Sequence, residues 1–343
     1  MTHTRPQDTD SLLSLSDVRV TFRTADGPIT PVDGVSFTIR RGETLALVGE
    51  SGCGKSLTAL TILRLIEPPG RIEPGSRITF DGQDVLTLDD RSLRKIRGKQ
   101  AAMIFQEPMT ALNPVYNAGD QIAEVVRTHT SASRSEAWAQ AVEMLGAVGI
   151  PSPEIRARQY PHQLSGGMRQ RVMIAMALIL NPSLLIADEP TTALDVTIQA
   201  QILDLLREAQ RARGASMLLI THDLGVVAES AQRVAVMYAG QIVEEAPVAE
   251  LFVSPQHPYT QGLLAAMPRA GTRRERLTTI PGTVPPPGAW PSGCRFADRC
   301  AHMWSRCTTE APPLHQLGGG RTSRCHLVSE PSHRVATGAE VHA

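Results

Sequence analysis

Residues 49–56 read Gly-Glu-Ser-Gly-Cys-Gly-Lys-Ser and match the pattern G-x-x-x-x-G-K-[ST] at every fixed position. A mostly apolar run, Thr44 to Val48, precedes them, and a helical pattern over Leu57 to Ile66 follows. Strand, glycine-rich loop and helix in this order form a phosphate-binding loop, in which backbone N–H groups and a helix N-terminus surround a phosphate. The stretch predicts a nucleotide site at the end of a buried strand.

Different residues of this loop are expected to contact different parts of a nucleoside triphosphate and its Mg²⁺. Lys55 is expected to neutralise the β- and γ-phosphate oxygens, and Ser56 to ligate Mg²⁺. The remaining contacts are expected from Gly49, Ser51, Gly52, Cys53, Gly54 and Leu57. Cys53 fills a variable position without a catalytic duty. Its place near a helix N-terminus predicts a lowered thiol pKa and alkylation that nucleotide prevents.

A second element of the site comes from the run Leu184 to Ala187, which is followed directly by Asp188 and Glu189. Two carboxylates at the carboxyl end of a buried strand lie where α/β sheets bind ligands. Asp188 is expected to hold Mg²⁺ through a water, and Glu189 to orient and deprotonate the water that attacks the γ-phosphate. The alternative is that both are solvated acids at a strand end.

Other short apolar runs, bounded by polar or turn residues, are typical of fully buried parallel strands: Ala101 to Phe105, Met217 to Ile220 and Val234 to Tyr238. Helical patterns lie between them. One opens with the capping-box spacing Ser133 to Glu136 and is expected to end at Gly146. The sequence therefore predicts an α/β fold.

The first part of the chain has a different pattern. Apolar residues alternate at Val18, Val20 and Phe22, within a segment from Leu15 to Ile39. Alternation with period two predicts a small antiparallel sheet beside the main one.

Composition restricts the classes of function. The 343 residues include 34 Lys+Arg and 34 Asp+Glu, so the net charge is zero and no nucleic-acid partner is expected. With 42% hydrophobic and 20% charged residues, the chain is expected to fold around a sizeable core. A polar N-terminus and the lack of long apolar runs predict neither signal peptide nor membrane span, and hence a cytoplasmic chain.

Residues 164–171 read Leu-Ser-Gly-Gly-Met-Arg-Gln-Arg and lie just upstream of the Asp-Glu strand. They resemble the signature motif of ATP-binding-cassette (ABC) ATPases. Further landmarks follow in the order of that family: Gln106 after Phe105, Asp195 after Ala193-Leu194, and His222 after Thr221. The resemblance covers residues 12 to about 250. It implies a RecA-like core, a small antiparallel β subdomain and a helical subdomain that carries the signature.

The resemblance also implies roles. Cassettes of this family pair head to tail, so that Ser165, Gly166 and Gly167 would meet the γ-phosphate held by the other cassette. His222 would contact the γ-phosphate and support the attacking water, and Gln106 would reach the metal and that water. Asp195 would belong to the same nucleotide site, and Phe22 would stack on adenine. An ordinary core position is the alternative for Phe22, because it continues the alternation of Val18 and Val20.

The segment after the cassette resembles the C-terminal extension of oligopeptide and dipeptide importer ATPases. The resemblance rests on Ser254 to Thr260, on Ile280-Pro281-Gly282, and on Cys294 to Cys300. We therefore expect an ABC ATPase domain at 1–254 and an extension at 255–343, with an extended connector over Pro281 to Pro291.

The signature, as it stands here, resembles the first of two paired cassettes in those importers. It implies a heterodimer with a second, homologous ATPase subunit, two transmembrane permease subunits and an extracytoplasmic substrate-binding protein. The chain would then work at the cytoplasmic face of a bacterial inner membrane and power uptake of di- and oligopeptides. The alternatives are a soluble cassette protein, disfavoured by the single cassette without a coiled-coil arm, and a small-molecule kinase, in which the signature would have no role.

Four of the five cysteines lie in the extension, at Cys294, Cys300, Cys307 and Cys325. A cytoplasmic setting disfavours a disulfide framework. The gaps of five, six and seventeen residues are not the short C-x-x-C spacing typical of structural zinc. Four thiolates suit a [4Fe–4S] cluster, which the resemblance to importer ATPases implies, while zinc and free or oxidised thiols are the alternatives. The cluster would pin the extension, or act as a redox control.

Overall fold

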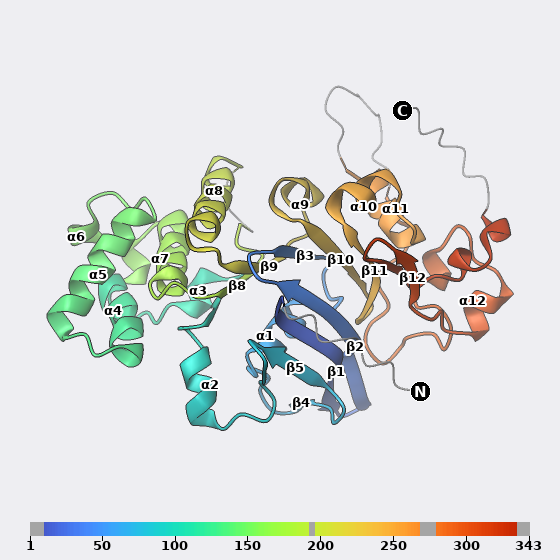
Figure 1. Ribbon diagram of the computed structural model, residues 1–343, viewed down its shortest axis with the longest axis horizontal. Helices are drawn as coiled ribbons and strands as arrows, with labels where there is room; N and C mark the ends of the chain where they lie inside the picture. The colour runs from blue at the N-terminus through green and yellow to red at the C-terminus, as the bar shows by residue number, and fades with distance from the viewer. Residues whose placement is uncertain (1–9, 192–195, 268–278, 335–343) are drawn as a thin grey trace.

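Two β-sheets and the helices around them form the protein (Figure 1). The structure, a computed structural model, describes residues 10–191, 196–267 and 279–334. Within these residues every helix is too short or too polar to cross a lipid bilayer.

The main sheet is built on parallel strands. Its order is β12 (His315–Gly318), β13 (Arg321–Ser323), β11 (Gln241–Pro247), β10 (Arg233–Tyr238), β3 (Thr44–Val48), β9 (Ser216–Ile220), β8 (Leu184–Asp188) and β7 (Ala101–Ile104). The strands from β10 to β7 run parallel, and β11, β13 and β12 add antiparallel pairs at one edge. All five predicted apolar runs are strands, which confirms the α/β fold.

The second sheet confirms the antiparallel prediction. Its order is β2 (Gly27–Arg40), β1 (Ser11–Thr24), β5 (Arg77–Phe80) and β6 (Gln83–Asp84), with β4 (Gly70–Ile72) paired to β1. It lies against one face of the main sheet, so that Val18 and Val20 share a core with Leu45 and Leu47.

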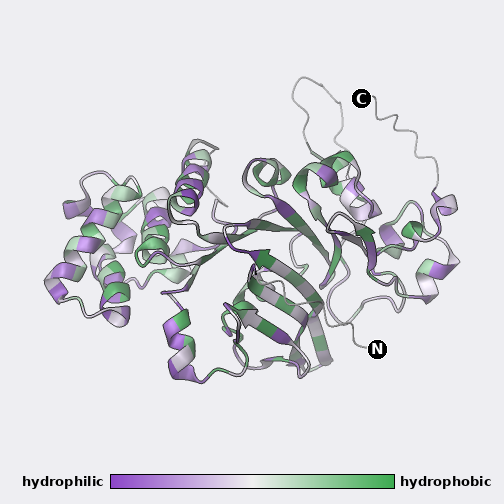
Figure 2. Ribbon diagram, in the orientation of Figure 1, coloured by the Kyte–Doolittle hydropathy of each residue, from purple (hydrophilic) through white to green (hydrophobic). Residues whose placement is uncertain are grey.

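Alternate residues of the central strands face two different cores. Leu184 and Ile186 of β8 lie in the core shared with the antiparallel sheet, whereas Leu185 and Ala187 lie in the core under the helices. Because both faces are covered, these strands are buried along their whole length and mostly apolar, apart from Asp188 at the end of β8 and Ser216 at the start of β9 (Figure 2).

A helical region follows β7. It contains α3 (Pro108–Ala111), α4 (Ala118–His129), α5 (Arg134–Ala147), α6 (Pro153–Arg156) and α7 (Gly166–Leu178), and lies at the left of Figure 1. The capping box at Ser133 and Glu136 is present at the start of α5. The predicted end at Gly146 is wrong, because Gly146 lies inside the helix. Gly149, with φ of 74°, takes the left-handed conformation after it.

The helix after the phosphate loop, α1 (Lys55–Ile62), is shorter than the predicted run to Ile66. The carbonyl groups of Leu63 and Arg64 accept hydrogen bonds from the Arg97 guanidinium at 2.7 and 2.8 Å. Arg64 also has φ of 51°, which is outside the helical region. The Arg97 side chain, which comes from the end of α2 (Asp90–Ile96), thus satisfies carbonyls that end the helix.

The remaining helices are α8 (Val196–Arg213), α9 (Leu224–Ser230), α10 (Val248–Val253), α11 (Pro258–Ala265) and α12 (Ser305–Thr309). Short 3₁₀ turns occur at Pro161–Gln163, Ala297–Arg299, His326–Val328 and Pro331–His333.

The extension packs on the cassette through a third core in which Tyr238, Tyr259 and Phe296 meet. β13 pairs with β11, so the main sheet continues across residue 254. The boundary between two domains at that residue stays a prediction.

Candidate nucleotide site

The phosphate loop connects β3 to α1 with a tight backbone that needs glycine. A Cβ atom at Gly49 would lie 2.2 Å from the carbonyl oxygen of Met237, and one at Gly54 would lie 2.6 Å from that of Pro31. Gly54 is also the residue that caps α1, with φ of 105°. The loop is therefore packed closely from behind, and its conformation presents the first turn of α1 to a ligand.

Lys55 lies buried across this loop. Its ammonium donates hydrogen bonds to the carbonyl oxygens of Gly49 at 2.8 Å and Glu50 at 3.0 Å. These bonds hold the side chain in the concave side of the loop, where the phosphate oxygens of a nucleotide bind. The structure thus places Lys55 inside the loop, and its contact with phosphate stays a prediction.

The predicted lowering of the Cys53 thiol pKa is wrong, whereas protection of Cys53 from alkylation by nucleotide stays a prediction. Cys53 is 1% exposed, and burial raises the pKa of its thiol, although the nearby Lys55 ammonium opposes this rise. The thiol packs under the loop, close to the position that a Cβ at Gly49 would take. Desolvation outweighs the helix N-terminus here, so Cys53 is a packing residue.

Ser56 and Asp188 form the pair of oxygen donors expected at a magnesium site. The Ser56 hydroxyl donates to a carboxylate oxygen of Asp188 at 3.0 Å, which joins the start of α1 to the end of β8. Asp188 is 3% exposed; burial raises its pKa, and the neighbouring Glu189 adds to the rise. A bound cation would remove that electrostatic cost, so this donor set fits Mg²⁺ beside a nucleotide phosphate.

Three polar side chains converge next to this pair. Gln106 Nε2 donates to Glu189 Oε2 at 3.3 Å, and His222 Nδ1 lies 3.4 Å from the same oxygen. The three residues follow the ends of β7, β8 and β9, which lie side by side in the sheet. Residues far apart in the chain therefore meet at one sheet edge, as expected of the carboxyl ends of parallel strands.

Glu189 is held in a defined position by its backbone. It has φ of 45°, and its N–H donates to the carbonyl oxygen of Ile220 at 3.0 Å. The Glu189 side chain is 14% exposed while that of His222 is 66% exposed, so the carboxylate is sheltered and the imidazole faces outward. This arrangement suits a carboxylate that orients one water molecule.

The signature motif lies at the start of α7. Ser165 caps this helix and accepts a hydrogen bond from the Met168 N–H at 3.3 Å, and both Ser165 and Gly166 are exposed. A Cβ at Gly167 would meet Ile198 at 3.4 Å, which leaves little room there. The helix N-terminus is therefore open to a ligand that comes from outside this chain.

A contact inside the chain joins the signature helix α7 to the loop after β8. The buried Gln170 side chain donates to the carbonyl oxygen of Pro190 at 2.7 Å, one residue after Glu189. Sequence reasoning quoted Gln170 only as a letter of the motif. Its neighbours in the fold show that it ties α7 to the loop after β8.

Two further predicted residues lie at or beyond the edge of this arrangement. Phe22 lies in β1 opposite Ile29 and Gly70, and its half-buried ring packs over Gly70 and onto the core. Stacking on adenine stays a prediction for this residue. Asp195 lies outside the described residues.

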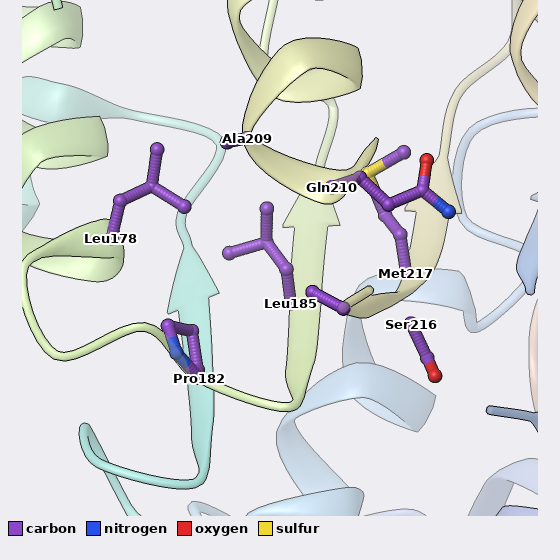
Figure 3. Close-up of a pocket in the computed structure, with 8 residues that line it drawn as sticks. Leu178, Pro182, Leu185, Ala209, Gln210, Ser216 and Met217 are labelled. Atoms are coloured by element: carbon purple, nitrogen blue, oxygen red, sulfur yellow. The ribbon is translucent and has the colours of Figure 1, made fainter. Parts of the chain in front are cut away.

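Another recess lies at the opposite end of the strands (Figure 3). It is apolar, and it is lined by Leu178, Pro182, Leu185, Ala209, Gln210, Ala215, Ser216 and Met217. Ser216 begins β9, so the recess opens at the amino end of the sheet. It shares no residue with the site at the carboxyl ends, where α/β proteins bind their ligands.

The extension gathers its four cysteines. Cys307 and Cys325 are buried, and Cys294 and Cys300 are half-buried against the aromatic core. Burial raises the pKa of Cys294 to about 11 and that of Cys325 to about 12, and the charges of the other thiolates add to both rises. Four sulfurs that repel one another as thiolates would be stabilised by a metal cluster.

The side chains are not arranged as ligands, however. Among residues 10–191, 196–267 and 279–334, no group of three or more His, Cys, Asp or Glu side chains has an arrangement that could hold a metal ion. The four cysteines therefore supply the sulfur donors that a cluster needs, but their side chains do not point toward a common centre.

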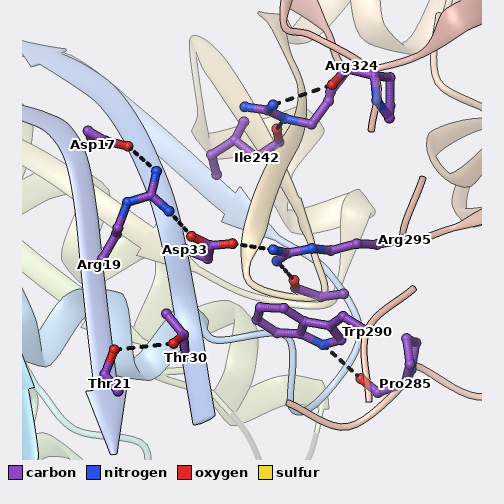
Figure 4. Close-up of polar contacts among 12 residues, drawn as sticks. Asp17, Arg19, Thr21, Thr30, Asp33, Ile242, Pro285, Trp290, Arg295 and Arg324 are labelled. Atoms are coloured by element: carbon purple, nitrogen blue, oxygen red, sulfur yellow. Dashed lines mark hydrogen bonds and ion pairs between the residues drawn. The ribbon is translucent and has the colours of Figure 1, made fainter. Parts of the chain in front are cut away.

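The extension also attaches to the cassette at residues that sequence reasoning missed. Arg295 pairs with Asp33 of β2, donates to the carbonyl oxygen of Ala239, and lies over the Trp290 ring with its guanidinium carbon 3.6 Å from the ring centre (Figure 4). Trp290 in turn donates to the carbonyl oxygen of Pro285 at 3.2 Å. The only sequence signal was the Arg-Phe-Ala-Asp-Arg stretch between two cysteines, which identified no partner.

The phosphate loop, the Asp188–Glu189 strand end, the converging Gln106 and His222, and the open signature helix together define the ATPase domain of an ABC transporter. The ABC transporter family model matches residues 32–192, and the model for the oligopeptide/dipeptide transporter C-terminal region matches residues 243–307.

The chain is 48% identical over 316 residues to the dipeptide transport ATP-binding protein DppD of Escherichia coli K12, covering 92% of this chain and 96% of that protein. It is 51% identical over 321 residues to the oligopeptide transport ATP-binding protein AppD of Bacillus subtilis 168, covering 93% and 98%. The chain belongs to the family of ATP-binding subunits of oligopeptide and dipeptide ABC transporters.

A solved structure shares the cassette fold. The dimeric post-hydrolysis state of an ATP-binding cassette, bound to ADP and inorganic phosphate, aligns with a TM-score of 0.62 and 29% identity. It covers 69% of this chain and 98% of that chain.

Proposed function

We propose that this chain hydrolyses ATP to drive uptake of di- and oligopeptides through separate permease subunits. The observation that carries the proposal is the meeting of Gln106, Glu189 and His222 beside the Ser56–Asp188 pair. The family of the chain, and the names of relatives that transport dipeptides and oligopeptides, support the choice of cargo.

In the proposed reaction Lys55 and the N–H groups of the phosphate loop hold the β- and γ-phosphates. Ser56 and Asp188 would hold Mg²⁺, which would supply positive charge beside the phosphate oxygens. Glu189 accepts a proton from the attacking water, while Gln106 and His222 orient that water and the γ-phosphate. The short distances of both side chains to Glu189 Oε2 support this division of roles.

We propose that the partner in hydrolysis is a second, homologous ATPase subunit in a heterodimer. The exposed Ser165 and Gly166, together with Gly167, would bind the γ-phosphate held by that subunit's phosphate loop. Since this contact exists only before hydrolysis, ATP binding closes the pair and hydrolysis opens it. Ser165→Ala should therefore weaken the binding of ATP at the partner's phosphate loop. Site-resolved photolabelling in the mixed dimer measures this, and a loss at the phosphate loop of this chain instead would contradict the proposal.

Two permease subunits and an extracytoplasmic binding protein complete the proposed importer, with this chain on the cytoplasmic face of the inner membrane. Large apolar side chains are exposed in the segment after Gln106: Met109 of α3 at 63%, Val115 at 70% and Tyr116 at 54%. Exposed apolar side chains that follow Gln106 closely in the chain support a permease contact at this point.

Uptake into proteoliposomes tests the function. The complete complex, given a peptide-loaded binding protein, should hydrolyse ATP faster and accumulate the peptide only with ATP inside. Mass spectrometry of the ligand retained by the binding protein identifies the cargo. Retention of a sugar or a metal chelate would contradict the peptide assignment and leave the ATPase role intact.

We propose in addition that Cys294, Cys300, Cys307 and Cys325 bind a [4Fe–4S] cluster that pins the extension. The gathering of four thiols in a segment of turns and short helices supports it, while their side chains would have to turn toward one centre. Iron, sulfide and zinc analysis of protein purified without oxygen tests it. About four irons and four sulfides per chain are expected, and stoichiometric zinc or metal-free protein would contradict the cluster.

A further inference from the structure

The C-terminal extension reaches the phosphate loop directly, at Glu50. The Glu50 N–H donates to the hydroxyl oxygen of Tyr259 at 2.8 Å. The Glu50 side chain accepts a hydrogen bond from Arg299 Nη1 at 3.1 Å. A single loop residue is thus held by two side chains that follow it by 209 and 249 positions in the chain.

Both side chains have fixed positions. Tyr259 is fully buried, with its ring centre 4.7 Å from that of Tyr238 and 5.5 Å from that of Phe296. The Arg299 side chain is 5% exposed, and its Nε donates to the carbonyl oxygen of Pro281 at 2.8 Å. Packed side chains of this kind lose little entropy when they form a hydrogen bond, so they can restrain a loop.

Tyr259 and the lysine of the phosphate loop, Lys55, both form hydrogen bonds with the backbone of Glu50. Tyr259 holds the N–H of Glu50, and the Lys55 ammonium donates to the carbonyl oxygen of the same residue at 3.0 Å. The hydrogen bond to Tyr259 occupies this N–H within the protein and restrains the backbone before Ser51. Restraint at this point limits the conformations of the loop that follows, which is expected to bind the phosphate.

We propose that Tyr259 and Arg299 are positioning residues of the nucleotide site, which set the affinity of the phosphate loop for nucleotide by fixing Glu50. The inference rests on the proposed function only in that the loop binds nucleotide. It goes beyond that function because it assigns the extension a direct part in nucleotide binding. Arg295 is anchored on Asp33 and Ala239 and lies just before the 3₁₀ turn that carries Arg299, so it helps to hold that turn in place.

Titration of the intact chain with MgADP tests the proposal without hydrolysis. Tyr259→Phe removes one hydroxyl and keeps the ring, and it should raise the dissociation constant about three- to tenfold, the effect of one lost hydrogen bond. Tyr238→Phe is the matched control. Its ring lies in the same core, and its hydroxyl accepts only a 3.4 Å contact from Arg299, so a change below about twofold is expected.

Equal losses in the two variants would show a general loosening of the core and overturn the proposal, as would an unchanged dissociation constant for Tyr259→Phe. Steady-state hydrolysis by the complex gives a second readout. Tyr259→Phe should raise KM for ATP and leave kcat unchanged. A lower kcat at unchanged KM would contradict a role in positioning the loop.

A double-mutant cycle on the affinity for MgADP tests the ion pair between Arg299 and Glu50. Arg299→Gln should weaken binding in the wild-type background and have no further effect in the Glu50→Gln background. The same loss in both backgrounds would show that Arg299 does not act through Glu50. Failure of the proposed function would appear in the wild-type chain, as absent nucleotide binding, and is therefore distinct from failure of this inference.

Discussion

The nucleotide site and the C-terminal extension place their important side chains in different ways. Asp188 ends strand β8, Glu189 and His222 follow β8 and β9 within two residues, and Lys55 begins the helix after β3, so regular backbone geometry brings them together. The extension has short helices and turns, and it attaches through single side chains such as Arg295 and Arg299. A site built on parallel strands can be located from local motifs, whereas attachments through long side chains cannot.

The strongest test of this contrast is Glu189→Gln. Loss of the catalytic base should lower ATP turnover by roughly 10²-fold or more while nucleotide binding is kept. Turnover by the assembled complex and MgATP titration measure the two effects separately. Glu124→Gln, at an exposed position of α4, is the control and should leave turnover unchanged. Near-normal turnover in Glu189→Gln would assign the base to another residue.

Lys55→Ala tests nucleotide binding at the same site, whereas Glu189→Gln tests hydrolysis. The ammonium makes charge-assisted hydrogen bonds, so its loss should weaken MgADP binding about 10- to 100-fold. Calorimetric titration gives the dissociation constant, and Lys95→Ala, at an exposed position of α2, serves as the control. Unchanged affinity would mean that Lys55 keeps its contacts with the loop carbonyls when nucleotide binds.

Cys300→Ala examines the extension by itself. If the cluster pins this segment, the variant should lose its iron, and protease should cut the extension at least about tenfold faster. Metal analysis and timed proteolysis measure both, with Cys53→Ala as the variant that should keep its iron. Unchanged iron and unchanged proteolysis together would refute the cluster at these cysteines.

The smallest effect is expected at the junction of the two regions, at His257. Burial lowers the pKa of this histidine to about 3, and its Nδ1 accepts a hydrogen bond from the Tyr259 N–H at 3.0 Å. Since the folded-state pKa lies below the unfolded value of about 6.5, the stabilisation is complete above pH 6.5 and is lost as the pH falls toward 3. The free energy of unfolding should decline by about 1 kcal/mol per pH unit below 6.5 on this account.

His257→Asn keeps an acceptor for the Tyr259 N–H and removes the titrating group. Denaturant unfolding at pH 7.5 and 5.5 should therefore show a smaller decline for the variant than for the wild type. Glu244 accepts a hydrogen bond from the His257 backbone, and its own titration is common to both proteins. Parallel pH profiles would show that His257 is not the group responsible.

Particular residues show how far the sequence predicts this site. Glu189 is predicted from its position after an apolar run, and Gln106 and His222 from their order in the family resemblance; their meeting within 3.4 Å follows from the strand order. Cys53 was mispredicted because its distance from a helix N-terminus is visible in the sequence and its burial is not. The end of α1 was missed for the same kind of reason, since Arg97 of a later segment satisfies its carbonyls.

The phosphate loop, the alternation of strands and helices, the antiparallel sheet and the family are all evident from the order of the residues. Each of these depends on residues that are close in the chain, where spacing alone sets the local backbone. The contacts of Tyr259 and Arg299 with Glu50, and the continuation of the main sheet through β13, are evident only in the folded chain. Such contacts depend on which distant segments pack together, and that choice is made by burial of the whole core.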